Sequence, residues 1–461
     1  MVRAAPAMTA AVAVPARFVS GPLRGHVLEM VLTGWASMLA VFAVEFLTLL
    51  YLGTLRDEAV LAAVGFGSMM LFTVTSICIG VTVGGAAQVS RALGAADARR
   101  ARGLAAASLV LMAVATVVSV AAFLFAVGPF TRAIGLASDV RALLLSYVAV
   151  TAPFSVVMGV GMMLSNLLRA AGHGRQSMWV LLAGIATVAI LDPVVIFLFN
   201  GGMQGVAWAG GAGRMATVVL GTWLVFGRHR LVAWPAWTGL RADLAEVGRI
   251  ALPATLSALA TPAAVVFTAS TYAGFGSSTM AGATVVDRIL QLSYSLFFVL
   301  PGAIGPILGQ NLGAGHWPRV RQTVGITARM ALGYGACVAI LLALLAPWIA
   351  DLFQVSGPGR ELVMVFCRYA SFIWALNSVF FVSVAVFNNL GYASYATAVG
   401  WLRATVGTLP FVWLGARYGD AEGVLLGQTL GFALSSLLAL VLCLRVLRHP
   451  PPGLSPARAL A

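Results

Sequence analysis

The chain has 461 residues, of which 61% are hydrophobic and 9% are charged, and its mean hydropathy is +0.97. Soluble globular domains carry about 25% charged residues, so this composition excludes a soluble protein and indicates a polytopic membrane protein. The formal net charge of +14 comes from arginine alone, because the sequence contains no lysine. This absence excludes phosphate-loop lysines, Schiff-base lysines and Ser-x-x-Lys pairs, and with them ATP-driven transport by this chain alone.

The arginines lie in short loops between apolar stretches, which is typical of membrane topology and not of nucleic-acid binding. The four cysteines lie singly inside apolar spans without CxxC spacing, which favours core residues over metal ligands or disulfides. Neither an HExxH nor a G-x-S-x-G motif is present. The sequence therefore predicts neither an enzyme nor a bound metal or cofactor.

At the start of the chain, residues 1–26 hold alanines and valines interrupted by Pro6 and Pro15, which predicts a disordered cytoplasmic tail and not a signal peptide. Twelve apolar spans follow, each long enough to cross about 30 Å of hydrocarbon. They cover roughly residues 28–52, 59–90, 104–128, 142–168, 177–199, 205–226, 250–274, 279–311, 324–349, 362–388, 395–415 and 423–446.

The distribution of arginine sets the orientation. Placing both termini in the cytoplasm puts most arginines on the inner side, as the positive-inside rule requires, and leaves Arg214, Arg288 and Arg403 within spans. The histidines fall in inner segments or at their edges, so no histidine proton relay is expected inside the membrane. We therefore predict an integral protein of a bacterial-type inner or plasma membrane.

The spans repeat at an offset of 219 residues. The stretch AQVSRALGAADARRARG (87–103) matches PILGQNLGAGHWPRVRQ (306–322), and Gly172 matches Gly391. Six spans in each half give both halves the same orientation, so the repeat is parallel. The predicted fold is an all-α membrane protein with twelve transmembrane helices in two six-helix lobes. Its predicted parts are a cytoplasmic N-terminal tail (1–26), an N-lobe (27–227), a cytoplasmic connector (228–248), a C-lobe (249–449) and a disordered C-terminal tail (450–461).

Asp192 is the strongest candidate for a functional residue, because it lies beside Pro193 inside the apolar stretch TVAILDPVVIFLF (187–199). A carboxylate at bilayer depth costs roughly 2.5 to 3.5 kcal/mol on insertion scales, so such residues usually face a protein-lined cavity. Pro193 leaves one backbone carbonyl without its helical partner and gives the helix a place to bend. Two interpretations stay open: a titrating or ion-binding group in a transport pathway, or a buried acid paired with a structural donor.

The repeat also shows that the two lobes are not equivalent. The C-lobe position that corresponds to Asp192 falls at about Pro410 and carries no acid. The acid well inside a C-lobe span is Asp287, which has either a structural ion-pair role or a role in cation recognition. Arg100 and Arg319 are equivalent in the repeat, and we predict that they act in topology and loop docking and not in transport chemistry.

Aromatic side chains within the spans are further candidates for substrate contact. A ring face attracts a cation with about 0.5 to 2 kcal/mol. Most aromatics in membrane helices instead lie at interfaces or between helices. The candidates are Trp35, Trp208, Tyr272, Tyr294 and Trp374.

Five short motifs, in this order, resemble the multidrug and toxic compound extrusion (MATE) family: LAAVGFG (61–67), RALGAAD (91–97), LLRAAGHGR (167–175), ILDP (190–193) and GQNLGAG (309–315). The resemblance covers almost the whole chain. It implies a V-shaped, two-lobed antiporter that exports amphipathic, often cationic, organic compounds against an inward flow of protons or sodium ions. Asp192 looks like the span 5 aspartate of the family, which contributes to coupling. We expect a monomer whose partners are a small-molecule substrate and membrane lipid.

The chain departs from the family pattern at several positions. Thr48 stands where span 1 of the family usually carries an aspartate, and Glu45, one helical turn earlier, can supply the missing carboxylate. Val188 replaces a usual asparagine, and Thr33 replaces a usual proline. The stretch TPAAVVF (261–267) lacks the carboxylate that some relatives use for sodium, which favours protons as the coupling ion.

Two other classes were weighed against an antiporter. A lipid-linked oligosaccharide flippase of the same superfamily shares the two-lobed repeat, and its anionic substrate requires arginines in the central cavity, for which Arg214, Arg288 and Arg403 are candidates. The count of twelve spans and the acids of the N-lobe favour the exporter of cations. A membrane-embedded enzyme requires a catalytic motif that the sequence does not contain.

Overall fold

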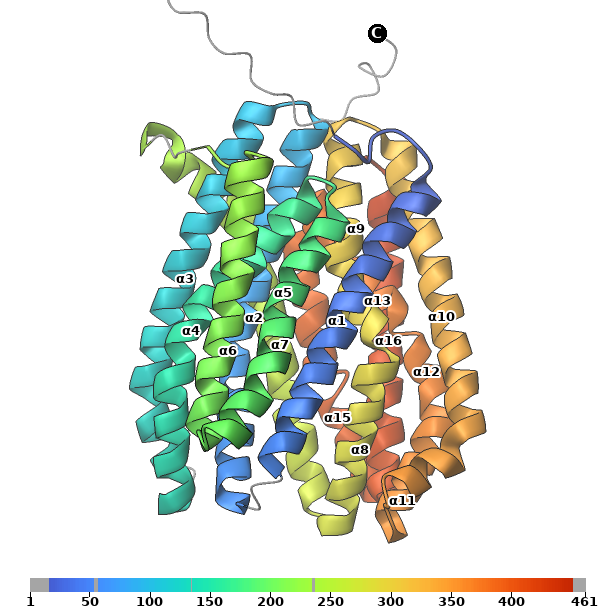
Figure 1. The fold of residues 1–461 in the computed structure, drawn as a ribbon. Helices are drawn as coiled ribbons and strands as arrows, with labels where there is room; N and C mark the ends of the chain where they lie inside the picture. The colour runs from blue at the N-terminus through green and yellow to red at the C-terminus, as the bar shows by residue number, and fades with distance from the viewer. Residues whose placement is uncertain (1–15, 54–56, 134, 234–236, 451–461) are drawn as a thin grey trace, which may run out of the picture.

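The computed structural model describes residues 16–53, 57–133, 135–233 and 237–450. These residues form a bundle of long helices that run side by side (Figure 1). Residues 16 and 450, the two ends of the described chain, lie at the same end of the bundle, which we call the terminal face (Figure 1). The other end is called the opposite face.

The N-lobe comprises the first six predicted spans. Two of these spans end in a π-helical turn. In such a turn the backbone N–H groups donate to carbonyls five residues earlier, instead of four as in an α-helix. The elements are α1 (Leu23–Gly53), α2 (Glu58–Gly94), α3 (Ala98–Ala133), α4 (Ser138–Ala170), α5 (Gly174–Pro193), η1 (Val194–Leu198), α6 (Gly202–Thr222) and η2 (Trp223–Arg228).

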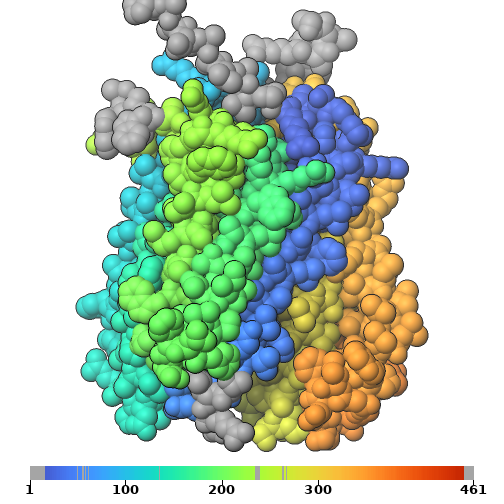
Figure 2. All heavy atoms as spheres, viewed as in Figure 1, coloured from blue at the N-terminus to red at the C-terminus, as the bar shows by residue number. Residues whose placement is uncertain are grey.

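The C-lobe comprises the remaining helices and is more segmented than the N-lobe. Its elements are α7 (Trp237–Ala273), α8 (Ser277–Ser293), α9 (Ser295–Gly313), α10 (Trp317–Leu352), α11 (Gly357–Val365), η3 (Phe366–Ala370), α12 (Ser371–Ala375), α13 (Ser378–Leu390), α14 (Ala393–Ala404), α15 (Leu409–Tyr418) and α16 (Asp420–Arg448). On the face shown in Figure 2, α1 lies between the green α5 and α6 and the orange α10 to α12.

Ten helical segments of the described chain are long and apolar enough to cross a membrane by length and composition. The predicted span 250–274 corresponds to α7, whose first turns carry charged residues. The predicted span 395–415 is interrupted, because α14 ends at Ala404 and α15 begins at Leu409. Pro410 explains the interruption, since proline has no N–H to continue one helix and is favoured in the first turn of the next.

The predicted connector, 228–248, is partly helical, because α7 begins at Trp237 and includes the charged Arg241 and Glu246. Three of the four cysteines are buried as predicted, but Cys337 is exposed on α10. No disulfide and no cluster of metal-ligating side chains forms within the described ranges.

Matching turns of the two lobes keep the same backbone geometry. Gly172, between α4 and α5, has φ +90°, and Gly391, between α13 and α14, has φ +91°. In the turn after α2, Ala96 has φ +58°, and its repeat mate Gly315, after α9, has φ +75°. Left-handed backbone is unfavourable for residues with a Cβ atom. The turn at Ala96 is therefore strained, whereas Gly315 adopts the same conformation without strain.

Candidate functional site

Asp192 and Thr48 meet inside the N-lobe. The Thr48 hydroxyl on α1 donates a hydrogen bond to Oδ2 of Asp192, in the last turn of α5. The Asp192 side chain is buried, with 1% of the residue exposed, and its Oδ1 has no hydrogen-bond partner within the described residues. Burying an unpaired charge costs free energy, so a proton or small cation on the open oxygen stabilises this site.

The backbone beside Asp192 departs from a regular α-helix. α5 ends at Pro193, and the next five residues form η1, where the Phe199 N–H donates to the carbonyl of Val194. Pro193 cannot donate a backbone hydrogen bond, and π-helical turns occur frequently at functional sites. The sequence predicts a bend at Pro193, but the apolar run VVIFL carries no signal for a π-helical turn.

Glu45 and Asp287 lie in a different environment from Asp192, because both residues are exposed. Glu45 on α1 interacts electrostatically with Arg288 on α8, across the boundary between the lobes. Asp287 interacts with Arg288 and with Tyr272, which is 6% exposed. The α1–α8 boundary therefore carries acidic and basic groups from both lobes within electrostatic range of one another.

The three arginines within predicted spans have three different environments. Arg214 on α6 donates to the carbonyl of Thr151, 3.1 Å away, inside the N-lobe. Arg288 is exposed on α8. The guanidinium carbon of Arg403 on α14 lies 4.0 Å from the ring centroid of Phe432 and 4.6 Å from that of Phe380. Within the described part of the chain, no residue forms a hydrogen bond or an ion pair with more than one of these three arginines.

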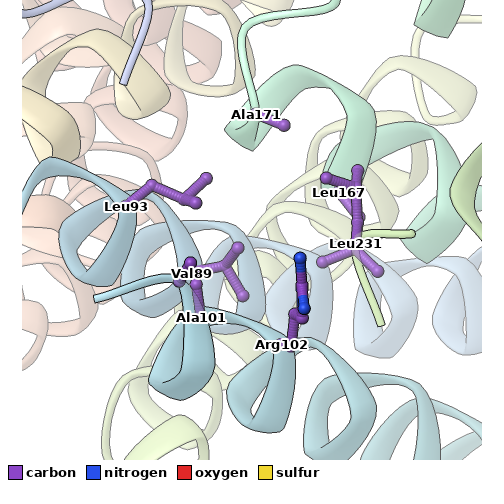
Figure 3. Close-up of a pocket in the computed structure, with 8 residues that line it drawn as sticks. Val89, Leu93, Ala101, Arg102, Leu167, Ala171 and Leu231 are labelled. Carbon is purple, nitrogen blue, oxygen red and sulfur yellow. The ribbon is translucent and has the colours of Figure 1, made fainter. Parts of the chain in front are cut away.

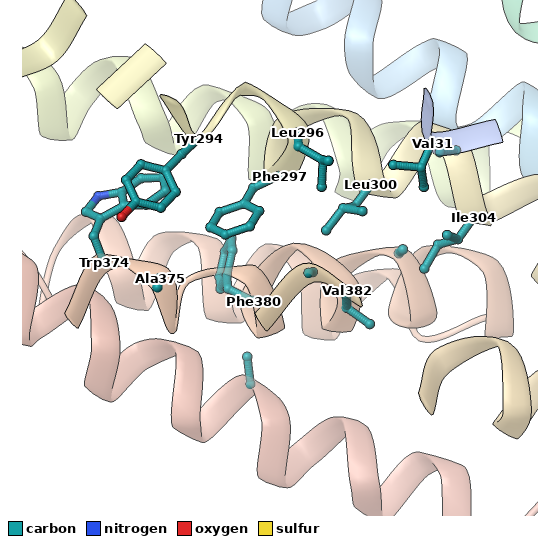
Figure 4. Packing of buried hydrophobic residues seen from close by; sticks show 14 of the residues in the cluster. Val31, Tyr294, Leu296, Phe297, Leu300, Ile304, Trp374, Ala375, Phe380 and Val382 are labelled. Atoms are coloured by element: carbon teal, nitrogen blue, oxygen red, sulfur yellow. The ribbon is translucent and has the colours of Figure 1, made fainter. Parts of the chain in front are cut away.

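Two aromatic candidates lie inside the core of the C-lobe. Tyr294 is 0% exposed and Trp374 is 4% exposed, and Figure 4 shows both beside Phe297. The Tyr294 hydroxyl donates to the carbonyl of Ser371 at 2.8 Å. Both side chains are therefore closed off from solvent in this conformation.

The other aromatic candidates are spread over the molecule. Trp208 is 59% exposed on α6 and makes an edge contact with Phe154. Trp35 on α1 is half-buried, and its indole N–H donates to Ser295 Oγ of the C-lobe at 2.8 Å. This contact joins the two lobes. The candidates therefore do not converge on one cavity.

The lobes touch closely in the half of the bundle nearer the terminal face. A Cβ atom added to Gly80 of α2 would lie 2.1 Å from Thr255 Oγ1 of α7, and one added to Gly94 would lie 2.0 Å from the carbonyl oxygen of Gln310 of α9. Small residues allow helices to approach to this distance. The path between the lobes is therefore closed at the terminal face.

Residues 16–22, here called the latch segment, bridge the two lobes at this closed end. Phe18 is 1% exposed, its N–H donates to Gln310 Oε1 at 2.9 Å, and Arg319 Nη2 donates to its carbonyl at 3.0 Å. On the N-lobe side, Arg17 Nη1 donates to the carbonyl of Gly172 at 2.6 Å. The prediction of a disordered tail is therefore wrong for these residues, while residues 1–15 lie outside the described ranges. Helical periodicity could not predict the burial of Phe18, because residues 16–22 precede the first helix.

A small pocket at the end of the N-lobe does not qualify as a substrate site. It lies between α2, α3 and α4 and is lined by Val89, Leu93, Leu167, Leu231 and Arg102 among others (Figure 3). Its volume is about 10 Å³. That is room for about one water molecule and not for an organic compound.

A family model, MatE, matches residues 35–194 and 253–414, so one copy falls in each lobe. The chain is 23% identical over 436 residues to a protein of Shewanella oneidensis named FAD transporter, which covers 93% of this chain and 96% of that relative. It is 20% identical over 281 residues to the probable multidrug resistance protein YpnP of Bacillus subtilis, which covers 60% and 62%.

The fold is also similar to a solved structure. The crystal structure of the Vibrio cholerae MATE transporter VcmN in the bent form superposes with a TM-score of 0.86 and 22% sequence identity. The match covers 92% of this chain and 97% of that chain. The likeness therefore extends over both lobes.

Proposed function

Because this chain belongs to the MATE family, we propose that it is a secondary active transporter that exports amphipathic organic cations in exchange for protons. The observation that carries the proposal is the buried Asp192, whose Oδ2 accepts a hydrogen bond from Thr48 while Oδ1 is left open. We further propose that the protein acts as a monomer in a bacterial-type plasma membrane, with the terminal face in the cytoplasm.

The proposed exchange uses one buried carboxyl group with two states. With the terminal face closed, a proton arriving from the outside binds Asp192 and removes the cost of a buried charge. A protonated acid attracts a cation less than a carboxylate does, so substrate leaves on that side. Proton release to the cytoplasm restores the carboxylate after the lobes rearrange, and a few kcal/mol of differential affinity suffices to bias the two arrangements.

The exposed groups at the α1–α8 boundary are proposed to meet the substrate first. Glu45 and Asp287 offer carboxylates to a cation. Sodium as the coupling ion stays an alternative, since Asp192 Oδ1 is also an oxygen ligand of the kind that hard cations bind. Protons are preferred on the resemblance to the family, because the stretch TPAAVVF (261–267) lacks the carboxylate that some relatives use for sodium.

A second candidate function is export of an anionic flavin compound. One observation favours it: the relative named FAD transporter matches almost the full length of this chain. Arg288 at the exposed boundary would then bind the substrate. A lipid-linked oligosaccharide flippase gains less support, because Arg214 and Arg403 engage protein groups within separate lobes.

The test uses everted membrane vesicles that contain the protein and keep their interior more acidic than the surrounding medium. Adding a cationic dye should collapse part of the gradient in wild type, and Asp192→Asn, which cannot titrate, should abolish this response. Glu45→Gln should lower it less, because Glu45 assists the coupling by Asp192 from a position one helical turn before the one at which the family carries its acid. Asp139→Asn, a change of an exposed acid in the first turn of α4, serves as the matched control and should keep wild-type exchange.

Two results would contradict the proposal. If Asp192→Asn inserts normally and exchanges dye and protons at the wild-type rate and pH dependence, coupling lies elsewhere and Asp287 becomes the next candidate. If FAD but not the dye is transported, with loss in Arg288→Gln, the anionic substrate replaces the cationic one.

A further inference from the structure

A cavity at the boundary between the lobes lies outside the site described above. It has a volume of about 570 Å³ and lies near the terminal face, between the end of α2, the first half of α7 and the turn from α13 to α14. Its polar lining residues are Gln88, Arg91, Glu246, Arg249 and Ser394. Ligand pockets typically measure about 300 to 1,000 Å³, so the cavity has room for a small organic group and not only for an ion.

The charge of the lining is positive. Arg91 comes from the N-lobe and Arg249 from the C-lobe, and none of the ion pairs within the described residues uses either of them. Glu246, the acid of the lining, is paired with Arg100 of α3. Two arginines therefore line the cavity, and its one carboxylate forms an ion pair with a third arginine and interacts electrostatically with Arg91.

One hydrogen bond holds the guanidinium group of Arg91. Its Nη2 donates to the carbonyl of Asn389 at 2.8 Å, whereas its Nε is buried and has no partner within the described residues. One hydrogen bond therefore positions the Arg91 side chain at the wall of the cavity, and a guanidinium group there can donate charge-assisted hydrogen bonds to an anion.

The C-lobe adds backbone donors to the same cavity. α14 begins at Ala393, and its first residues, Ala393 and Ser394, line the cavity. Tyr392, the residue before the helix, makes no capping hydrogen bond with its side chain. The first N–H groups and the positive end of a helix dipole favour an anion, especially one with several oxygens such as phosphate.

We propose that this cavity binds a phosphate-bearing anion, and that the bound anion stabilises the arrangement in which the lobes touch at the terminal face. Both parts follow from the placement of the donors, because Arg91 and Arg249 line one cavity only while their lobes are in contact. With the terminal face in the cytoplasm, as proposed above, the head group of an anionic lipid of the inner leaflet is one source. Basic pockets between membrane helices bind such head groups.

The binding test uses purified full-length protein in phosphatidylcholine nanodiscs. Phosphatidylglycerol is added in one arm and inorganic phosphate in the other, and the rise in melting temperature is followed against concentration. Arg249→Gln should bind phosphatidylglycerol roughly tenfold more weakly than wild type, the loss expected for one charge-assisted contact. Arg91→Gln should act in the same direction. Arg241→Gln, an exposed arginine on the same helix outside the lining, should bind as wild type does.

The two arms separate the sources of the anion. Phosphatidylglycerol binding without a response to phosphate assigns the cavity to lipid, and an equal response to inorganic phosphate assigns it to a soluble anion. Equal responses of wild type and Arg249→Gln to both probes would overturn the proposed site. Neither arm depends on transport, so failure here leaves the proposed function untouched.

The conformational part is tested with spin labels at the terminal-face ends of the two lobes. Arg99→Cys and Arg321→Cys are exposed positions for this purpose, in a Cys337→Ser background, because Cys337 is exposed and would also be labelled. Adding the anion should increase the fraction of molecules in which the two spin labels are close together. This increase should be absent in Arg249→Gln. A distribution that does not respond to saturating anion would overturn the claim that the anion holds the lobes together.

Discussion

The fifth span of the N-lobe and its repeat mate in the C-lobe differ in both backbone and charge. In the N-lobe the helix is continuous up to Pro193, and a buried acid, Asp192, accepts a hydrogen bond from Thr48. In the C-lobe the helix is broken between α14 and α15, the matching position at about Pro410 carries no acid, and Arg403 in α14 contacts the rings of Phe380 and Phe432. Only the N-lobe position can gain and lose a proton, since arginine stays charged.

The turns that connect these spans show the opposite pattern, because their backbone is kept while their side chains change. Gly172 and Gly391 have almost the same left-handed φ. The residues that follow them are His173 in the N-lobe and Tyr392 in the C-lobe. The repeat therefore preserves the backbone of both lobes, whereas the acid Asp192 and the histidine His173 have no counterpart of the same type in the C-lobe.

From the sequence alone, replacing either of the repeat-equivalent arginines Arg319 and Arg100 with Gln should leave export near wild type, but the hydrogen bonds of Arg319 lead us to expect a larger effect there. Arg319 donates to Asn311 Oδ1 and to the carbonyls of Phe18, Ser20 and Gly21, so it holds the latch segment on the C-lobe. Charge-assisted hydrogen bonds contribute about 1.5 to 3 kcal/mol each, so Arg319→Gln should destabilise the closed terminal face and lower dye export about tenfold. Hydrogen exchange of residues 16–22 should become faster.

Arg100→Gln is the matched control. Arg100 pairs with Glu246 on the surface, with its side chain 50% exposed, and such pairs are worth about 0 to 1 kcal/mol. Export should stay within about twofold of wild type, because a twofold change corresponds to RT ln 2, about 0.4 kcal/mol, which is near the middle of that range. Equal export by the two variants would show that the latch segment has no role in closure.

Arg403 should act in stability and not in coupling. Its guanidinium contacts Phe380 and Phe432, and cation–π contacts contribute about 0.5 to 2 kcal/mol each. Arg403→Met should therefore lower the free energy of unfolding by about 1 to 2 kcal/mol, whereas the number of protons exchanged per dye stays the same. Urea unfolding followed by tryptophan fluorescence measures the first quantity.

Arg417→Met provides the comparison for an exposed contact, because Arg417 lies 5.5 Å from the ring centroid of Trp413 at the surface. The Arg417→Met change should lower the free energy of unfolding by about 0.5 kcal/mol. A changed proton-to-dye ratio in Arg403→Met would place a coupling group in the C-lobe and remove the asymmetry argued above.

The repeat and the composition of the chain predicted most of the architecture. An offset of 219 residues places the two lobes, and matching glycines place the turns after α4 and α13. The break between α14 and α15 was not predicted, although Pro410 carried the signal for it. Hydropathy reports length and composition, and it cannot show where a long apolar stretch stops being one helix.

The site was predictable only in part. Asp192 and Thr48 were candidates from sequence, and the structure brings them into one hydrogen bond. The aromatic candidates were harder, since Tyr294 is fully buried and Trp208 is 59% exposed although both lie in apolar segments. Spans that are apolar on all sides carry no amphipathic pattern, so the face on which a residue lies cannot be read from them.

His173 and its repeat mate Tyr392 should give the two lobes a different response to acid. His173 stacks on His229 with ring centroids 4.0 Å apart, and burial, followed by the charges of His229, Arg17 and Arg228, lowers the pKa of His173 to about 4. Protonation is therefore less favourable in the folded protein than in the unfolded chain, whose histidine pKa is about 6.5. The stability that the neutral ring contributes is fully present above about pH 6.5 and is lost as the pH falls toward 4.

His173→Tyr replaces the histidine with the residue that the C-lobe carries at this turn. Tyrosine does not titrate in this range, so the melting temperature of the variant should fall less than that of wild type between pH 6.5 and pH 4. His316→Tyr, a change of an exposed histidine at the start of α10, should leave the pH dependence as in wild type. If His173→Tyr and wild type lose stability in parallel over this range, the acid sensitivity of the N-lobe arises outside the His173–His229 pair, and this turn does not contribute to the division between the lobes.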